Sequence, residues 1–417
     1  VQIARTLHGL PCVVGYDTFN EPSHGYIGWK DLNTVDSPLK QDMQPTALQS
    51  FALGDGLPQD VATWTTGSRG ARQTGHRLIN PKGVRAWREG MPCIWREHGV
   101  WGTGPEGRPQ ILQPDYFTQV HGRPVDFAQD YVVPFISRYA AAIHAVDPNA
   151  LIFAEVEPNA ALPRIPEGSV PGLVSAPHWY DGAALVLQRP IPQLGYDALR
   201  NRVVIGRLPV RRSFARQLRV LGSMGREQMH APTVIGEIGI PMDMAGKTAY
   251  RTGNFRVQEA ILDRSLAAVD AALCSSVLWN YAADNTNERG DGWNSEDFSL
   301  WSADQGRDLR VPDCGGRALR SAVRPYPLAT CGEPLSLSFD IRRHILRYTF
   351  RHDPVIDVPT ELFLPPFQYP FGYQVWTTDG TFLEDKTRHV LLYRHTLSRP
   401  THTIIVRPRP AKRGHRR

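Results

Sequence analysis

The sequence lacks any long apolar run, and its longest unbroken apolar stretches are only four or five residues. A bilayer-spanning helix needs about 20 such residues, so a transmembrane helix is excluded. Cysteine is scarce, with five residues and no CxxC pair, which argues against a disulfide scaffold. No Asn-x-Ser/Thr acceptor site occurs either. This absence disfavours a secreted chain, and we expect a cytoplasmic or vacuolar location.

The body of the chain has no excess of basic residues. The formal charge is +6, from 47 Lys and Arg against 41 Asp and Glu, but ten of the basic residues follow Asp385, the last acidic one. The basicity therefore belongs to the C-terminal end, and no basic stripe of the kind that binds nucleic acid is present. We expect no nucleic-acid partner.

Signatures of cofactor and metal sites are also missing. The sequence contains no Gly-rich phosphate loop and no Ser-His-Asp nucleophile elbow. Cys93 and His98 have no second Cys/His pair nearby, so a zinc site is not indicated. We expect no cofactor and no metal.

What the sequence does contain, through residues 1–330, is an alternation of short apolar runs with segments of helical periodicity. Alternation of this kind predicts a parallel sheet with helices packed on it, and polar or aromatic residues recur where the predicted strands end. The predicted strands are residues 10–19, 150–154, 173–176, 233–235 and 276–279, and the predicted helices are 126–146, 213–224 and 254–272.

Two regions depart from this alternation. Residues 37–122 are rich in Gly, Pro and Trp with little periodicity, which predicts a long functional loop. Residues 331–406 contain short β-branched and aromatic runs separated by turns, which predicts an antiparallel β-sandwich domain. Residues 407–417 carry six basic residues and no acid. We expect this tail to be disordered. It either stays solvated without a partner or contacts anionic lipid.

Two glutamates stand at strand ends where a pair of catalytic carboxyl groups would be needed. Cleavage of a glycosidic bond with retention uses two carboxyl groups about 5 to 5.5 Å apart. Glu21 closes the first predicted strand and Glu237 the one at 233–235. Either glutamate alone is as readily read as a surface charge. Glu155 and Glu157 also follow a strand, and we treat them as weaker candidates for ligand contact.

Four further residues at these strand ends have side chains suited to a sugar site. Asn20 offers an amide to a sugar hydroxyl, and Tyr180 can donate a hydrogen bond to Glu237. Trp279 can form an apolar platform under a sugar ring. His178 lies two residues before Tyr180.

These motifs together resemble glycoside hydrolase family 5, in its fungal endoglycoceramidase-related branch of glucosylceramidases and steryl β-glucosidases. The resemblance covers nearly the whole chain. It is carried by Gly15–Pro22 with His24–Trp29, Asn80–Trp87, Cys93–Trp101, Pro177–Asp181, Ile235–Gly239 and Leu278–Tyr281.

The resemblance implies a (β/α)₈ TIM barrel followed by a C-terminal β-sandwich. It implies that Glu21 is the acid/base, after the fourth barrel strand, and Glu237 the nucleophile, after the seventh. Asn20, His178, Tyr180 and Trp279 are implied to line the sugar site.

A fourth strand that ends near residue 21 leaves only twenty residues for three strands and their helices. We therefore expect this chain to lack the first three strands of the barrel, and expect such a fragment alone to be inactive. The competing interpretation is that residues 37–122 replace the missing units.

The aromatic residues of the insertion bear on the aglycone. On a barrel they could wall a pocket for a sterol or ceramide, or simply form the core of the insertion. They are Trp29, Phe51, Trp64, Trp87, Trp95 and Trp101.

The sequence thus predicts a retaining β-glucosidase that releases glucose from a glycolipid. Steryl β-glucoside is favoured as the substrate, with glucosylceramide as the alternative. A hypothesis of another class is a non-catalytic glycolipid-binding or membrane-binding protein, for which a peripheral anionic membrane would be the partner.

Overall fold

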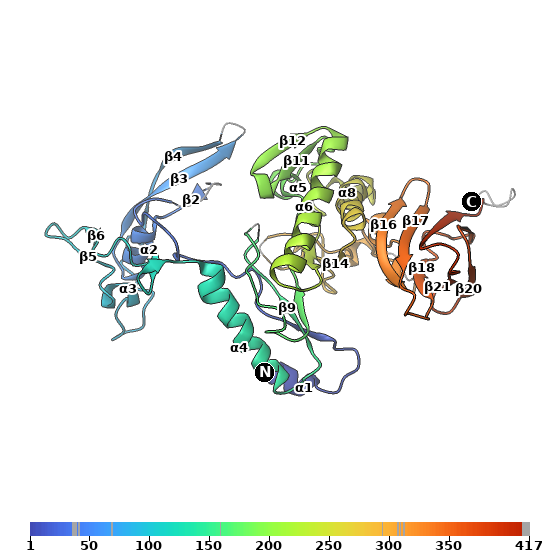
Figure 1. Ribbon diagram of the computed structural model, residues 1–417. Coiled ribbons are helices and arrows are strands. Elements are labelled where there is room, and N and C mark those ends of the chain that lie inside the picture. Colours follow the sequence, from blue (N-terminus) through green and yellow to red (C-terminus); the bar gives the residue numbers. More distant parts are fainter. Residues whose placement is uncertain are drawn as a thin grey trace. The chain divides into compact units, whose positions relative to one another are not determined.

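The computed structural model describes residues 1–35, 40, 42–67, 70–158, 160–293, 295–306, 308, 310–311 and 313–410. The chain forms two compact units. One consists of residues 1–21 and 136–417, and the other of residues 22–135. In Figure 1 the first runs from the parallel sheet through the green and yellow helices to the red C-terminal strands.

Five parallel strands in the first unit follow one another in sequence order. The strands are β1 (Gly15–Asp17), β9 (Leu151–Ala154), β10 (Leu173–Ser175), β13 (Val234–Ile238) and β14 (Ser275–Leu278). β1, β9 and β10 form one ladder, and β13 pairs with β14. Two parallel bridges, from Ser175 to Thr233 and from His178 to Glu237, connect β10 to β13. Their carboxyl ends therefore lie at one edge, as in a barrel.

Helices cover this sheet, and the two longest pack on each other. They are α6 (Arg207–Gln228) and α8 (Arg256–Ala272), and their buried faces share a core that includes Phe214, Leu218 and Ile261. The sequence predicted α6 only from residue 213. It begins six residues earlier because Pro209 lies in the first turn, where the missing N–H costs nothing.

Shorter elements fill the connections of the first unit. They are α1 (Gln2–Leu7), α4 (Val133–His144), α5 (Gly182–Leu187), the hairpin of β11 (Leu194–Asp197) and β12 (Arg202–Ile205), the 3₁₀ turns η2 (Ala198–Arg200) and η3 (Ala303–Gln305), α7 (Thr248–Thr252) and α9 (Leu319–Ala322).

The predicted antiparallel β-sandwich is confirmed. One sheet has the order β15-β18-β21-β20 and the other β16-β17-β22-β19, and their facing side chains form a core that includes Tyr348, Phe350 and Tyr393. The strands are β15 (Tyr326–Ala329), β16 (Gly332–Asp340), β17 (Ile345–His352), β18 (Thr360–Phe363), β19 (Tyr373–Thr377), β20 (Thr381–Asp385), β21 (Val390–Arg394) and β22 (Thr401–Pro408).

The structure corrects the predicted start of the tail. β22 continues through Arg407 and Pro408, and the Arg409 guanidinium donates to the carbonyl of Tyr373. These residues therefore belong to the β-domain. Residues 411–417, the rest of the predicted tail, lie outside the described residues.

A buried arginine joins the β-domain to the helical layer. Arg324 donates to Asp263 and to Asp270, both at 2.7 Å, and both acids lie on α8. Its side chain is 7% exposed, so these charges are paired away from water. Such a network holds two layers in one arrangement, since an unpaired charge would be costly there.

The second unit is not the irregular loop that its composition predicted. It has its own core, formed by Phe51, Val100, Trp101 and Phe117 among others, and an N-terminal capping box at Thr46. Its elements are β2 (Asp42–Met43), α2 (Ala47–Gly54), β3 (Gln59–Gly67), β4 (Gly70–Ile79), α3 (Ile94–Glu97), β5 (Trp101–Thr103), β6 (Pro109–Ile111), β7 (Gln119–Val120), β8 (Arg123–Pro124) and η1 (Ala128–Val132).

Most of the six insertion aromatics belong to this core. Phe51 and Trp101 are buried in it, and Trp29, Trp87 and Trp95 pack against it. Trp64 instead lies under the Lys40 ammonium, 4.6 Å from the ring centre. The alternative that these rings form the core of the insertion therefore accounts for five of the six.

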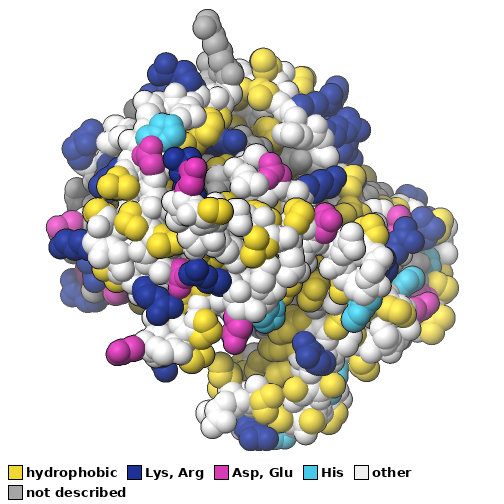
Figure 2. All heavy atoms as spheres, turned by 90° about the vertical axis from the view of Figure 1, so that its left-hand side faces the viewer, with side chains coloured by type: hydrophobic (Ala, Val, Ile, Leu, Met, Phe, Trp, Pro, Cys, Tyr) yellow, Lys and Arg dark blue, Asp and Glu magenta, His cyan; other side chains and the backbone are white. Residues whose placement is uncertain are grey.

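Among the described residues, no helix has the length and apolarity required to cross a bilayer. On the face drawn in Figure 2, basic and acidic side chains lie interspersed with hydrophobic ones. This mixture differs from the single-sign stripe typical of a nucleic-acid interface.

Candidate active site

The candidate site lies where the parallel strands of the first unit end. Glu21 follows β1, Glu155 follows β9, and His178 follows β10. Glu237 is the last but one residue of β13 and is paired with His178 in a parallel bridge. Residues far apart in sequence meet here because parallel strands end at a common edge.

His178 connects the two predicted catalytic glutamates. Its Nδ1 lies 2.9 Å from Glu21 Oε1 and 2.8 Å from Glu237 Oε2. One acid oxygen from each glutamate and one His178 nitrogen all lie within 4.8 Å of one another. This separation matches the short carboxyl spacing of retaining glycosidases and is below the 6.5 to 9.5 Å typical of inverting ones.

The other side of the His178 ring also contacts a carboxylate. Its Nε2 lies 3.1 Å from Glu155 Oε2, so both ring nitrogens donate. Burial alone would lower the pKa of His178, but the hydrogen bonds that its ring donates to Glu155, Glu21 and Glu237 outweigh burial and raise the pKa to about 11. The ring is therefore an imidazolium at neutral pH.

Glu155 is a buried hydrogen-bond acceptor for both His178 and Glu21. The same Oε2 that accepts from His178 also accepts from the backbone N–H of Glu21, at 2.9 Å. The Glu155 side chain is 6% exposed. Burial, and then the charge of Glu155, raise the pKa of the neighbouring Asp17 to about 7.

Glu21 adopts an unusual backbone conformation. Its φ is +41°, in the left-handed region, and the following Pro22 further restricts it. Few non-glycine residues adopt this conformation, and they concentrate at functional sites, where surrounding contacts maintain it. Here the hydrogen bond from the Glu21 amide to Glu155 is such a contact.

The two glutamates differ in their surroundings. The Glu237 side chain is 13% exposed and the Glu21 side chain 39%. Tyr180 donates to Glu237, and burial, with the charge of Glu237, raises the pKa of this tyrosine. The more buried carboxylate, Glu237, thus accepts hydrogen bonds from two donors, Tyr180 and His178.

Trp279 and Asn20 lie at the same strand ends with fewer contacts. Trp279 follows β14, and its indole N–H donates to Glu296 Oε1 at 3.4 Å. Asn20 precedes Glu21 and is exposed. The structure thus brings Glu21, His178, Tyr180 and Glu237 into one connected set of contacts. Trp279 is linked to this set indirectly, because it donates to Glu296, whose carboxyl interacts electrostatically with Glu237 and Glu21.

Sequence analysis missed Glu296 and underestimated Glu155. Burial raises the pKa of Glu296, and the charges of Glu237 and Glu21 add to that rise, which places it near both. It lies in a polar loop without any strand to mark it. Glu155 did carry a signal, as a glutamate directly after a strand, but Glu157 has the same signal.

Glu21, His178 and Glu237 also have the composition of a metal site. Their contacts do not fit one, because a His178 that donates from both nitrogens has no lone pair for a metal. A second cluster, of His352, His395 and His402, lies in the β-domain. The arrangement at the strand ends is instead suited to acid–base and nucleophilic chemistry by two carboxyl groups.

Comparison with known proteins gives three concordant matches. Residues 324–406 match the glycoside hydrolase family 5 C-terminal domain. The chain is 31% identical over 411 residues to a glucosylceramidase of Rhizopus delemar, covering 91% of this chain and 59% of that protein. It is 26% identical over 486 residues to an ergosteryl-beta-glucosidase of Saccharomyces cerevisiae, covering 94% and 63%.

A solved structure agrees with these matches. The chain superposes on sterylglucosidase 1 of Cryptococcus neoformans with a TM-score of 0.88 and 29% identity, covering 98% of this chain and 66% of that one. The chain spans between 55% and 63% of the length of the curated relatives that it matches. These matches confirm the resemblance that the sequence motifs indicated.

Proposed function

We propose that this chain is part of a glycoside hydrolase family 5 enzyme and carries the catalytic pair of a retaining β-glucosidase that releases glucose from a glycolipid. The observation that supports this most is the spacing of Glu21 and Glu237, whose acid oxygens lie within 4.8 Å of each other around His178. Of the two glycosidase mechanisms, the retaining one uses carboxyl groups this close, whereas the inverting one needs a wider spacing.

In the first step, Glu237 attacks the anomeric carbon while the bond from that carbon to the aglycone oxygen breaks. Glu21 gives its proton to the departing oxygen, so the aglycone leaves as an alcohol and glucose remains esterified to Glu237. In the second step, Glu21 takes a proton from water, and the resulting hydroxide displaces Glu237 and releases glucose.

The environments of the two glutamates support this division of roles. A nucleophile must be ionised, and Glu237 receives hydrogen bonds from Tyr180 and His178. An acid/base must exchange protons with water, and Glu21 is the more exposed of the two. His178 lies against both, so its positive charge offsets the negative charge that moves between them during turnover.

A steryl β-glucoside is the favoured substrate and glucosylceramide the alternative. The names of relatives include both activities, and the superposed structure is a sterylglucosidase. The test is to assay purified ergosteryl glucoside and glucosylceramide side by side with the full-length protein. Faster release of glucose from the ceramide would reverse the preference. Release from neither would favour the alternative of a non-catalytic glycolipid-binding protein.

We further propose that the five parallel strands are the fourth to eighth strands of a (β/α)₈ barrel. Family 5 enzymes have such a barrel before their β-domain, and the order β1, β9, β10, β13, β14 supports this numbering. Under this proposal, residues 1–417 expressed alone present unpaired strand edges and aggregate without activity. A monomeric, active product of that expression would contradict it.

Contact with an anionic membrane is a related proposal, since a glycolipid substrate resides in a bilayer. The basic residues after Asp385 support it, because each Lys or Arg near an anionic surface adds attraction of about 1 kcal/mol. Removal of residues 411–417 should weaken binding to anionic vesicles at low salt. Unchanged binding would favour the alternative of a solvated tail that does not contact the membrane.

A further inference from the structure

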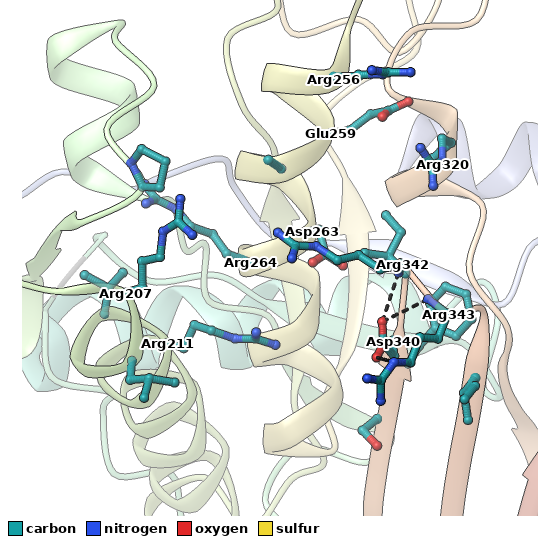
Figure 3. A pocket seen from close by; sticks show the side chains of 18 of the residues that line it. Arg207, Arg211, Arg256, Glu259, Asp263, Arg264, Arg320, Asp340, Arg342 and Arg343 are labelled. Atoms are coloured by element: carbon teal, nitrogen blue, oxygen red, sulfur yellow. Dashed lines mark hydrogen bonds and ion pairs between the residues drawn. The ribbon is translucent and has the colours of Figure 1, made fainter.

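A large pocket lined by arginines lies in the first unit, away from the catalytic pair. Its volume is about 930 Å³, and eight arginines but only three carboxylates line it. Figure 3 labels the arginines of α6, α8, α9 and the turn after β16 around one open space, and Arg347 of β17 also lines the pocket. We call it the arginine pocket.

Two of the eight arginines have carboxylate partners. Arg264 donates to Asp181 at 2.7 Å, and Arg343 lies 4.0 Å from Asp340. Among the residues that the structure describes, the other six guanidinium groups make no ion pair and no hydrogen bond. They are Arg207, Arg211, Arg256, Arg320, Arg342 and Arg347, and all six are exposed.

The acids of the pocket do not neutralise this charge. Asp263 is already paired with Arg324, which lies outside the pocket. Glu259 is the acid nearest to Arg256 and Arg320, whose charges oppose the rise of its pKa that burial causes. Several like charges held around one space repel one another, so their convergence indicates an anionic occupant. Guanidinium groups match phosphate oxygens in particular, because they can donate two parallel hydrogen bonds.

The pocket lies toward the same edge of the sheet as the catalytic pair. Phe214, two turns into α6, packs on Trp179, which follows His178, with ring centres 4.9 Å apart. Gln258, in the first turn of α8, donates to the carbonyl of Met242, beyond the end of β13. The N-terminal ends of α6 and α8 therefore lie at the carboxyl ends of the strands, as in βα units generally. Arg207 and Arg256 begin these two helices, and Arg211 follows Arg207 by one turn.

We propose that the arginine pocket binds phosphate groups of anionic phospholipids and docks the catalytic edge of the first unit on a membrane. This proposal rests on the proposed function, because an enzyme whose substrate is a glycolipid must contact the bilayer that contains it. The exposed guanidinium groups come from five segments, which are α6, α8, α9, the turn after β16, and β17, and they can engage several headgroups. A single soluble phosphate would satisfy only a few of them.

The experiment compares two triple variants of the full-length protein with equal loss of charge. The pocket variant carries Arg207→Gln, Arg211→Gln and Arg342→Gln. The control variant carries Arg138→Gln, Arg189→Gln and Arg226→Gln, three exposed arginines outside the pocket. Cosedimentation measures binding to vesicles of phosphatidylcholine with and without phosphatidylserine. We expect the pocket variant to bind the anionic vesicles about 100-fold more weakly than wild type, and the control variant to bind within a few-fold of wild type.

Three outcomes would overturn the proposal. If both variants bind anionic vesicles equally weakly, the attraction depends on total charge and not on the pocket. If the pocket variant binds like wild type, the pocket does not contribute to membrane binding. Binding of millimolar inorganic phosphate by the wild type but not by the pocket variant, without any binding to vesicles, would assign the pocket to a soluble anion. Hydrolysis of a water-soluble chromogenic β-glucoside should be the same in all three proteins. Loss of that activity in all three would contradict the proposed function, while the vesicle measurement would still decide on the pocket.

Discussion

Glu21 and Glu237 have the same side chain, and their different surroundings must create their different roles. Replacement of either by glutamine preserves volume but removes the charge or the proton that the mechanism needs. We expect Glu21→Gln to lower turnover by about 10²- to 10⁴-fold, and Glu237→Gln by at least as much, because no covalent intermediate can form. Steady-state hydrolysis of a chromogenic β-glucoside by the full-length protein checks this.

The matched control for these variants is Glu167→Gln, which changes an exposed glutamate away from the site and should leave turnover unchanged. The pH profile of the wild-type protein should be bell-shaped, since Glu237 must be ionised while Glu21 is protonated. Near-normal turnover in either site variant would remove that residue from the mechanism.

His178 links the charge of the site to the stability of the fold. Its pKa is raised to about 11 by its carboxylate partners, whereas an unfolded histidine titrates near 6.5. The folded state thus binds the proton more tightly. The stabilisation is complete below pH about 6.5 and is lost progressively as the pH rises toward 11.

We therefore expect His178→Gln to lower the melting temperature strongly at pH 6 and less at pH 10. Thermal unfolding of both proteins across that range measures the difference. A gap in melting temperature that stays constant, or widens as the pH rises, would show that His178 is not held as an imidazolium.

Glu155 is the residue whose importance only the structure reveals. It contacts the Glu21 amide and the His178 ring with one oxygen, so it positions the acid/base without touching substrate. We expect Glu155→Gln to lower kcat with little change in KM. It should also lower the pKa of Asp17, because the charge of Glu155 contributes to raising it.

Kinetics over a range of pH will separate this role from a merely structural one. A positioning role shifts the pH profile of kcat, whereas general loss of folded protein would lower kcat at every pH by the same factor. Sequence could not distinguish Glu155 from Glu157, because the two residues follow the same strand and only tertiary contacts separate them.

At the scale of elements, the buried Arg324 connects the β-domain to α8. Arg324→Ala would leave Asp263 and Asp270 without their cation, and burial already raises the pKa of Asp270. We expect a loss of about 3 to 5 kcal/mol in the free energy of unfolding, the usual cost of breaking a buried pair. Urea denaturation measures it.

The comparison for this variant is an exposed ion pair of similar length. Arg388 donates to Glu361 at 2.7 Å, but its side chain is 55% exposed. Arg388→Ala should therefore cost less than about 1 kcal/mol. Equal losses in the two variants would mean that burial does not decide the contribution of these pairs.

The elements that the sequence predicted well are those with strong periodicity. The strand at 150–154, the helix at 254–272 and most strands of the β-domain match the structure within a few residues. The hairpin of β11 and β12 was missed, because it lies between stronger signals and its exposed residues, such as Ile205, do not alternate cleanly. The insertion was predicted, but its ordered fold was not, because its core is built from apolar residues scattered along the sequence without periodicity.

At the scale of the whole molecule, motif order was the strongest signal in the sequence. Separate short motifs, each weak alone, predicted which strand ends meet, and the bridge between His178 and Glu237 is a direct consequence of that order. The arginine pocket could not have been predicted. Its arginines come from segments more than a hundred residues apart, and they are collected by the packing of α6 on α8 and of α8 on the β-domain strand β16.

The central claim is that Glu237 and Glu21 act as nucleophile and acid/base on a β-glucoside. The most direct test is proton NMR of the first glucose released when the full-length protein hydrolyses ergosteryl β-glucoside. The account predicts that β-glucose appears first and then mutarotates, because two displacements at the anomeric carbon restore its configuration. Initial release of α-glucose would contradict the account.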